Sequence, residues 1–341
     1  MSEQLRLSES NLPDYLRDLG YLGSDEAVSV EKAGDGNINW VRRARVADGR
    51  SWIVKQARPA LERFPEYRVD TRRIVFEARY FALVRDHDAE HICPEILHFD
   101  EHERVLILED LGDVERLDQR LARGSDAAGA GTALARFLAA VHSATADDPD
   151  LAARFDNDAM RRLHGDHIFD LPFAGNDFPL EPEVEDRAAS LKTPEFRSLA
   201  ADAYRRYLEP RGVLVHGDVQ AGNILLPPAG PKLLDAEIAH VGDPAFDVAT
   251  LLAHLALPAL ARAGTAQALP AIEASWLAYA RARGDVAPRF AQVARYMGLE
   301  VLRRTVGAAR VTGLEPVAAS LRAIECGERW VRTPPDAPAR L

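Results

Sequence analysis

Short runs rich in apolar residues, which alternate with polar residues over Val28-Ser29-Val30, occur in the first third of the chain and predict β-strands. The runs cover Val28 to Val30, Arg43 to Val46, Ser51 to Val54, Glu95 to His98 and Val105 to Leu108. Apolar residues at helical spacing predict two helices in the same region, Leu12 to Leu19 and Asp70 to Arg85.

The pattern changes near residues 111–113, where Ala, Leu and Arg become frequent. Apolar residues then recur every three or four positions, which predicts helices over 132–143, 195–210, 248–263, 266–283, 287–311 and 315–331. We therefore predict the α+β class with two lobes, a β-sheet N-lobe over 1–111 and a mostly helical C-lobe over 112–341. The final Pro-Pro-Asp-Ala-Pro tail should be frayed.

Composition narrows the class of protein. A chain of 341 residues is long for a single core, which agrees with two lobes. Two cysteines, Cys93 and Cys326, are too few for a disulfide scaffold and predict a reducing cytoplasm. No signal peptide is expected at the N-terminus, and the apolar stretch 248–261 is shorter than the ~20 residues of a membrane span. The net charge of −11 argues against nucleic acid and anionic membranes as partners.

Three polar residues follow or precede short apolar runs in the second half of the chain. One apolar run leads into His216-Gly217-Asp218, and Asn223 precedes a second apolar run. A Pro-Pro-Ala-Gly-Pro turn at 227–231 and a third apolar run then end at Asp235. One hairpin should therefore present Asp218, Asn223 and Asp235 at a common end.

The oxygens of these three side chains suit a magnesium–nucleotide complex. Mg²⁺ takes oxygen ligands from one or two side chains and from phosphates, and Asn223 and Asp235 can supply the side-chain ligands. Asp218 would orient a hydroxyl nucleophile and take its proton. The spacing from His216 to Asn223 fits the H-x-D-x-x-x-x-N catalytic loop of protein kinases, with Gly217 at the position of their Arg. Since Asp and Asn are also common in turns, only the ordered set points to catalysis.

A glycine-rich segment and a lysine predict nucleotide binding in the first lobe. Gly34-Asp35-Gly36-Asn37 lies between two predicted strands, where glycines let backbone N–H groups approach phosphates. Lys55 ends the third strand, at the position of the phosphate-pairing lysine of kinases. Glu77 lies in the following helix, where it is placed to pair with Lys55. The alternative explanations are an ordinary hairpin turn and a solvent-exposed lysine.

Together these motifs resemble those of aminoglycoside phosphotransferases, choline kinases and their relatives, which carry His-Gly-Asp in this loop. The resemblance extends over Gly242-Asp243-Pro244-Ala245-Phe246-Asp247. It implies that Asp247 braces the catalytic loop and that His216 supports it. It also implies a bilobal protein-kinase-like fold, ATP and Mg²⁺ as cofactors, and a hinge where the backbone of Glu109 and Leu111 recognises adenine.

Three segments resemble 5-methylthioribose kinases more closely. The segment Gly34-Asp35-Gly36-Asn37-Ile38-Asn39 is similar to that family's phosphate loop, and Asp235-Ala236-Glu237 is similar to its Asp-x-Glu. Glu237 is therefore expected to assist Asp235 at the metal or to hold its loop. Arg303-Arg304-Thr305-Val306-Gly307 resembles the family's paired-arginine helix, which implies that both arginines lie by the sugar and the transferred phosphate. Ordinarily, one such arginine is exposed and one is salt-bridged. The resemblance also implies a homodimer.

The catalytic loop departs from that family, because Val219-Gln220-Ala221-Gly222-Asn223 is closer to the aminoglycoside and choline kinases. We predict an ATP- and Mg²⁺-dependent phosphotransferase acting on a hydroxyl of a small molecule, with 5-methylthioribose or a related deoxy-pentose favoured. The alternatives are an aminoglycoside O-phosphotransferase, a choline-type or homoserine-type kinase, and a nucleotide-binding pseudokinase. A choline kinase would need an aromatic cage. A pseudokinase is disfavoured because the catalytic set is complete.

Residues 144–200 have the weakest pattern. His164 and His167 suggest a metal site, but no Cys or third His completes a tetrahedral set, so we predict a polar loop or lid over 164–169. The acidic run 181–186 should begin a solvated helix; the alternative is that it attracts a polycation.

Overall fold

The computed structural model of the chain describes residues 4–34, 39–60, 68–146, 148–175 and 178–341. Contacts between residues divide it into two compact units. The N-terminal unit consists of Met1–Leu83 and Pro94–Asp113, and the C-terminal unit consists of Val84–Cys93 and Val114–Leu341. The lobe boundary at residues 111–112 stays a prediction.

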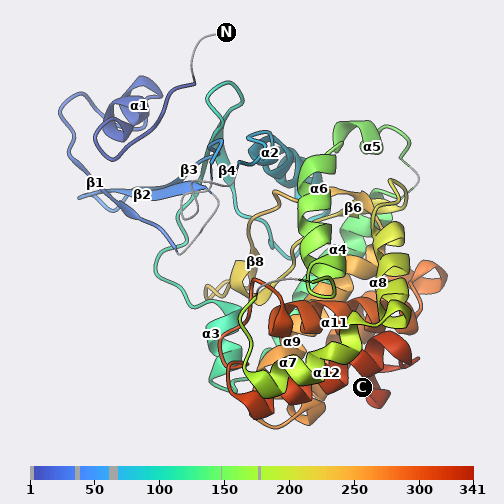
Figure 1. The fold of residues 1–341 in the computed structure, drawn as a ribbon. Coiled ribbons are helices and arrows are strands. Elements are labelled where there is room, and N and C mark those ends of the chain that lie inside the picture. The colour runs from blue at the N-terminus through green and yellow to red at the C-terminus, as the bar shows by residue number, and fades with distance from the viewer. Residues whose placement is uncertain (1–3, 35–38, 61–67, 147, 176–177) are drawn as a thin grey trace. The chain divides into compact units, whose positions relative to one another are not determined.

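The N-terminal unit is built on a five-stranded antiparallel sheet with the order β1-β2-β3-β5-β4 (Figure 1). Its strands are β1 Val28–Lys32, β2 Trp40–Val46, β3 Ser51–Gln56, β4 Ile96–Asp100 and β5 Val105–Glu109. Its helices are α1 Leu12–Asp18 and α2 Arg73–Val84. The strands and helices predicted for this region are therefore confirmed.

The two faces of this sheet carry separate hydrophobic cores. On β3, Val54 points to the face covered by α1, where it packs with Leu12 and other apolar residues. Neighbouring residues point to the opposite face, against which α2 packs through Ile74. Lys55 belongs to this second face, so the period of the strand directs its side chain toward α2.

The C-terminal unit is mostly helical (Figure 1). Its long helix α9 contacts α4, α10, α11 and α12. Its α-helices are α3 Leu117–Ala122, α4 Ala128–Ala144, α5 Leu151–Arg154, α6 Asp158–Gly165, α7 Pro182–Ala188, α8 Pro194–Tyr207, α9 Pro244–Arg262, α10 Leu269–Arg283, α11 Phe290–Val306 and α12 Val317–Arg332. By length and composition α9 could cross a membrane, but 83% of its apolar window is buried inside the protein. It is therefore placed as a core helix, and the α+β class is confirmed.

Four short strands of the C-terminal unit form two antiparallel pairs. They are β6 Val213–Val215, β7 Ile224–Leu225, β8 Lys232–Leu233 and β9 His240–Gly242. The predicted hairpin is present as β7–β8, whereas β6 pairs with β9. The prediction that one hairpin presents all three polar residues is therefore wrong for Asp218, which enters from a separate strand pair.

Two local predictions are wrong. Residues 164–169 form neither a loop nor a lid, because α6 continues into a π-helical turn, Asp166–Asp170, whose Ile168 and Phe169 are buried. The C-terminal tail is not frayed, since a short 3₁₀-helix at Pro338–Arg340 packs against α10. In both places buried apolar contacts stabilise segments whose local sequence is rich in polar residues or proline. The acidic run does begin an exposed helix turn at α7, as predicted.

Candidate active site

The His216-Gly217-Asp218 loop turns sharply where β6 ends. Gly217 has a φ of +85°, and a Cβ atom at this position would lie 2.8 Å from the carbonyl oxygen of Ile238. Only glycine tolerates both the left-handed backbone and this close approach. The turn places the Asp218 backbone N–H 3.2 Å from His216 Nδ1, to which it donates. His216 is fully buried, so it supports the loop from inside, as the resemblance implies.

Asp247 braces this loop from the first turn of α9. Its carboxylate accepts hydrogen bonds from the backbone N–H groups of His216 at 2.7 Å and Gly217 at 2.9 Å. A third contact joins it to His142 Nε2 at 3.4 Å. Burial alone would raise the pKa of the Asp247 carboxyl, but these partners hold the pKa below its ordinary value of 3.8. Asp247 therefore lies in contact with the loop, and its role as support of catalysis stays a prediction.

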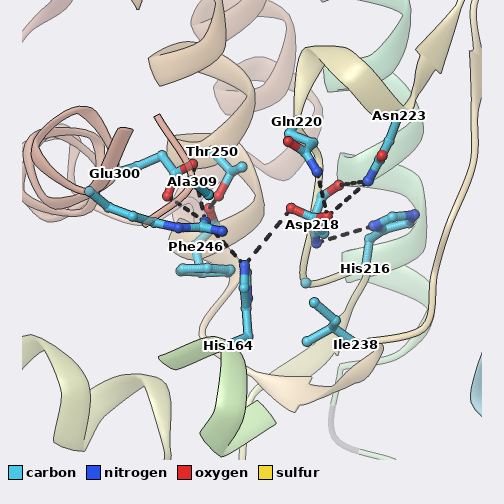
Figure 2. Close-up of polar contacts among 12 residues, drawn as sticks. His164, His216, Asp218, Gln220, Asn223, Ile238, Phe246, Thr250, Glu300 and Ala309 are labelled. Atoms are coloured by element: carbon cyan, nitrogen blue, oxygen red, sulfur yellow. Dashed lines mark hydrogen bonds and ion pairs between the residues drawn. The ribbon is translucent and has the colours of Figure 1, made fainter. Parts of the chain in front are cut away.

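The two carboxylate oxygens of Asp218 have different surroundings (Figure 2). Oδ2 accepts hydrogen bonds from Gln220 Nε2 at 2.8 Å and Asn223 Nδ2 at 2.9 Å. Within the described part of the chain, Oδ1 has no hydrogen-bond partner. The side chain is 14% exposed, and burial raises the pKa of its carboxyl. Oδ1 is therefore the carboxylate oxygen that still has acceptor capacity, and the role of Asp218 as a base stays a prediction.

The donor atoms near the hairpin fit a magnesium ion. Asn223 uses its amide N–H groups on Asp218, so only its side-chain oxygen can bind a cation. The N–H of Leu234 donates to the Asn223 carbonyl oxygen at 2.9 Å, which ties the Asp235 segment to Asn223. Asp235 has a φ of +63°, a conformation that is costly for a residue other than glycine and that is typical of functional sites. Its carboxylate lies within 4.8 Å of that of Glu237.

The predicted arginine pair lies on α11, and both side chains are buried. Glu300, one turn earlier, accepts from Arg303 Nη1 at 3.0 Å and from Arg304 Nε at 2.7 Å, and His254 Nε2 lies 3.1 Å from it. Burial would raise the pKa of the Glu300 carboxyl, but the two guanidinium groups hold it well below its ordinary value. Neither arginine is the exposed partner that is ordinary for adjacent arginines on a helix. Arg304 also donates to Gln220 Oε1 at 2.7 Å.

In the N-terminal unit, Lys55 and Glu77 form the ion pair that the sequence predicts. Lys55 Nζ lies 2.8 Å from one Glu77 carboxylate oxygen and 3.1 Å from the other, and both side chains are buried. The pair fixes the ammonium group of Lys55 at a defined place on β3. Its role on nucleotide phosphates stays a prediction.

The glycine-rich segment is described in part. Gly34 has a φ of +68°, while Asp35, Gly36 and Asn37 lie outside the described residues. At the other end of the segment, buried Asn39 accepts hydrogen bonds from Arg73 Nε at 3.0 Å and Nη2 at 2.7 Å. Arg73 therefore anchors the segment to α2.

The predicted hinge residues lie at the end of the sheet. Glu109 is the last residue of β5, and its backbone N–H donates to the Glu95 carbonyl oxygen at 3.0 Å. Leu111 follows in the segment that leaves the sheet. Their contact with adenine stays a prediction.

The polar residues of these networks that the sequence-based prediction of the site misses include Arg73, His142, Gln220 and Glu300. Gln220 could have been suspected from its place in the catalytic loop, and Glu300 from its helical spacing to the arginines. The other two had no local signal, because their partners lie far away in sequence.

Known proteins are similar to this chain in sequence, and others are similar to it in fold. It matches the model of the phosphotransferase enzyme family over residues 29–290, about three quarters of its length. Methylthioribose kinase from Yersinia enterocolitica is 29% identical, covering 93% of this chain and 90% of the relative. Methylthioribose kinase from Bacillus cereus is 26% identical, covering 92% and 87%.

Solved structures resemble the fold at low sequence identity. Choline kinase LicA from Streptococcus pneumoniae matches with a TM-score of 0.52 and 16% identity, covering 95% of this chain and 99% of that chain. Spectinomycin phosphotransferase APH(9)-Ia matches with a TM-score of 0.51 and 11% identity, covering 98% of each. The predicted kinase-like fold is confirmed.

Proposed function

Because this chain belongs to the phosphotransferase enzyme family and is a small-molecule kinase, we propose that it phosphorylates a hydroxyl of 5-methylthioribose or a related deoxy-pentose. One observation carries the choice of acceptor: the similarity to methylthioribose kinases extends over about nine tenths of both chains. A match of this extent includes α11 with its arginine pair as well as the general catalytic loop.

The donor atoms of the C-terminal unit support a division of roles. Asn223 and Asp235 would hold Mg²⁺ through oxygen atoms, with Glu237 beside them, and the bound ion would neutralise charge on the phosphates of ATP. Asp218 Oδ1 would orient the acceptor hydroxyl and take its proton. Gln220 and Asn223 hold Oδ2 so that the carboxylate cannot rotate away. Arg304 supports this arrangement through Gln220.

The N-terminal unit would contribute to nucleotide binding. Lys55, fixed by Glu77, would pair with the ATP phosphates, and the segment from Gly34 to Asn37 would contact them through backbone N–H groups. The backbone of Glu109 and Leu111 would bind adenine. We also propose a homodimer, on the basis of the family resemblance alone.

The test is ADP release with Mg²⁺ and ATP on a panel of acceptors: 5-methylthioribose, 5-deoxyribose, ribose, kanamycin, choline and homoserine. We expect the highest kcat/KM with the thiosugar or the deoxy-sugar. The matched control is Asp218→Asn, which should lose turnover by about 10²-fold or more while it still binds ATP, because only the base is removed.

The other outcomes separate the proposal from its rivals. Turnover on kanamycin or choline alone would contradict the pentose and leave the kinase assignment in place. Full turnover by Asp218→Asn would remove Asp218 from the role of base, whichever acceptor is used.

A further inference from the structure

His164 lies in the last turn of α6, and its ring faces Asp218 (Figure 2). The ring packs edge-on against Phe246, with the ring centroids 6.1 Å apart, and the residue is only 8% exposed. The next residue is glycine for a steric reason, since a Cβ atom on Gly165 would lie 2.5 Å from Tyr204 Cε2 of α8. This close packing of α6 on α8 holds the histidine ring in place.

The hydrogen bond at Nε2 decides which nitrogen of the His164 ring carries the proton. Nδ1 is buried without a hydrogen-bond partner among the described residues, so it is unsatisfied in either tautomer and the partner of Nε2 makes the difference. Nε2 lies 3.2 Å from Arg303 Nη1. A guanidinium group can only donate, so Nε2 must be the acceptor and the ring proton must be on Nδ1. Arg303 Nη1 has two hydrogens, and its second acceptor is Glu300 at 3.0 Å.

The charges around the ring favour its neutral form. Burial and the adjacent Arg303 lower the pKa of His164 well below its ordinary value, with Glu300 acting in the opposite direction and Arg304 and His240 adding to the lowering. A doubly protonated ring would place two positive charges side by side in a buried site. His164 therefore faces Asp218 with a nitrogen that carries no proton.

This protonation pattern matters for Asp218. His164 Nε2 lies 3.9 Å from Asp218 Oδ1, which is too long for a hydrogen bond. With no proton on Nε2 the two atoms are both acceptors, so nothing pulls them together. If Nε2 carried the proton, it would be a donor next to a carboxylate oxygen that has no hydrogen-bond partner among the described residues, and a charge-assisted hydrogen bond would form after a small shift.

We propose that Arg303 is a positioning residue, which keeps His164 in its neutral Nδ1–H tautomer and so leaves Asp218 Oδ1 free for the acceptor hydroxyl. The proposal rests on the proposed role of Asp218 as the base. Arg303 would act on Asp218 Oδ1 indirectly, by holding the tautomer of His164. Arg304 instead supports Asp218 Oδ2, because it holds Gln220, which donates to that oxygen. Without Arg303, the ring would become an internal competitor of the substrate.

A double-mutant cycle tests this action. Arg303→Met removes the donor to Nε2, and we expect kcat to fall by about tenfold to hundredfold, because general-base catalysis contributes about 10²–10⁴-fold. KM for ATP should change little. Adding His164→Phe removes the competing donor, so the double variant should recover at least about tenfold of the loss. Arg304→Met is the matched control, because adding His164→Phe to Arg304→Met should not restore kcat.

A kcat of the Arg303→Met/His164→Phe double variant no higher than that of Arg303→Met would overturn the proposal and favour direct contact of Arg303 with the substrate.

A second readout needs no acceptor. Nitrogen-15 NMR of the histidine rings reports the tautomer of His164, whose signals are identified by their loss in His164→Phe. We expect the Nδ1–H form in the unmodified protein and in Arg304→Met, and the Nε2–H form in Arg303→Met. Arg303→Lys should retain the Nδ1–H form, because the lysine ammonium group can donate a hydrogen bond to Nε2 but cannot accept one. An Nε2–H ring in the unmodified protein would overturn the proposal even if every acceptor on the panel failed, so its failure is distinct from that of the proposed function.

Discussion

Two aspartates of the same loop region, the buried Asp247 and the partly buried Asp218, have opposite electrostatic surroundings. Asp247 receives two backbone N–H groups and His142, and its pKa lies below the ordinary value. Asp218 keeps one oxygen without a hydrogen-bond partner among the described residues, and burial raises its pKa. At the scale of the residue, the first carboxylate is saturated and structural, whereas the second has an acceptor left for chemistry.

We predict that Asp247→Asn destabilises the protein and disorders the catalytic loop. The amide keeps one acceptor and places N–H groups against the N–H of His216 or Gly217, which should cost about 2–4 kcal/mol and reduce turnover as well. Urea unfolding followed by circular dichroism measures the cost. Asp118→Asn, in a partly exposed pair with Arg116, is the control and should cost less than about 1 kcal/mol. An unfolding midpoint of Asp247→Asn at the same urea concentration as that of the unmodified protein would contradict the prediction.

The same variant has a pH signature. Because the pKa of Asp247 is lower in the folded than in the unfolded state, its stabilisation is complete above its unfolded value of about 3.9 and is lost as the pH falls through the folded value. The stability difference between the variant and the unmodified protein should therefore be constant near neutral pH and shrink only below about pH 4.

At the scale of the element, the position of α11 depends on its close contact with α12. A Cβ atom on Gly298 would lie 2.6 Å from the carbonyl oxygen of Gly327, and one on Gly327 would lie 2.8 Å from Leu302. The two helices therefore approach at a pair of glycines. Because Glu300 and both arginines follow Gly298 on α11, this contact also sets where the arginines meet the catalytic loop.

We predict that Gly298→Ala costs about 1–3 kcal/mol through overpacking and lowers kcat by displacing α11. The matched control is Gly129→Ala on α4, where a Cβ atom meets nothing within 4 Å and should stabilise the helix by up to about 1 kcal/mol. Thermal unfolding and turnover of both variants provide the measurement. Equal stabilities of the two variants would show that α11 and α12 can separate without cost.

The whole molecule carries a net charge of −11, and its long apolar helix is a core helix. A strongly acidic surface attracts cations over distances set by the ionic strength, but it has no such effect on a neutral sugar. The charge therefore gives a way to separate a pentose from a polycation as the acceptor.

We expect KM for a neutral pentose to remain nearly constant between low salt and about 0.5 M NaCl at saturating Mg²⁺ and ATP, since ionic screening does not act on an uncharged ligand. A polyamine acceptor would show a KM that rises severalfold. Steady-state kinetics with 5-methylthioribose and kanamycin in the same salt series make the comparison. A strong salt dependence with the pentose would count against neutral-sugar recognition.

Much of the fold and part of the site follow from local pattern. The period of two on β3 directs Lys55 to the face that α2 covers, and Glu77 meets it there. Asp218 enters from the separate β6–β9 pair, which the local pattern did not predict, whereas the order of Asn223 and Asp235 along short apolar runs predicts the β7–β8 hairpin. Such features can be predicted because side-chain direction and turn chemistry depend on neighbours in sequence.

Tertiary structure alone decided the rest. The polar segment around His164 is helical and partly buried, with Gly165 packed against Tyr204 of α8, and this packing brings the ring to Asp218. The proton on that ring, the free oxygen of Asp218 and the link from Arg304 through Gln220 depend on partners that are distant in sequence. Local sequence therefore specifies which elements form and which residue types are available for chemistry. Packing then decides which atom of each residue remains available for chemistry, because buried polar groups bond to the partners that the fold brings within hydrogen-bond distance.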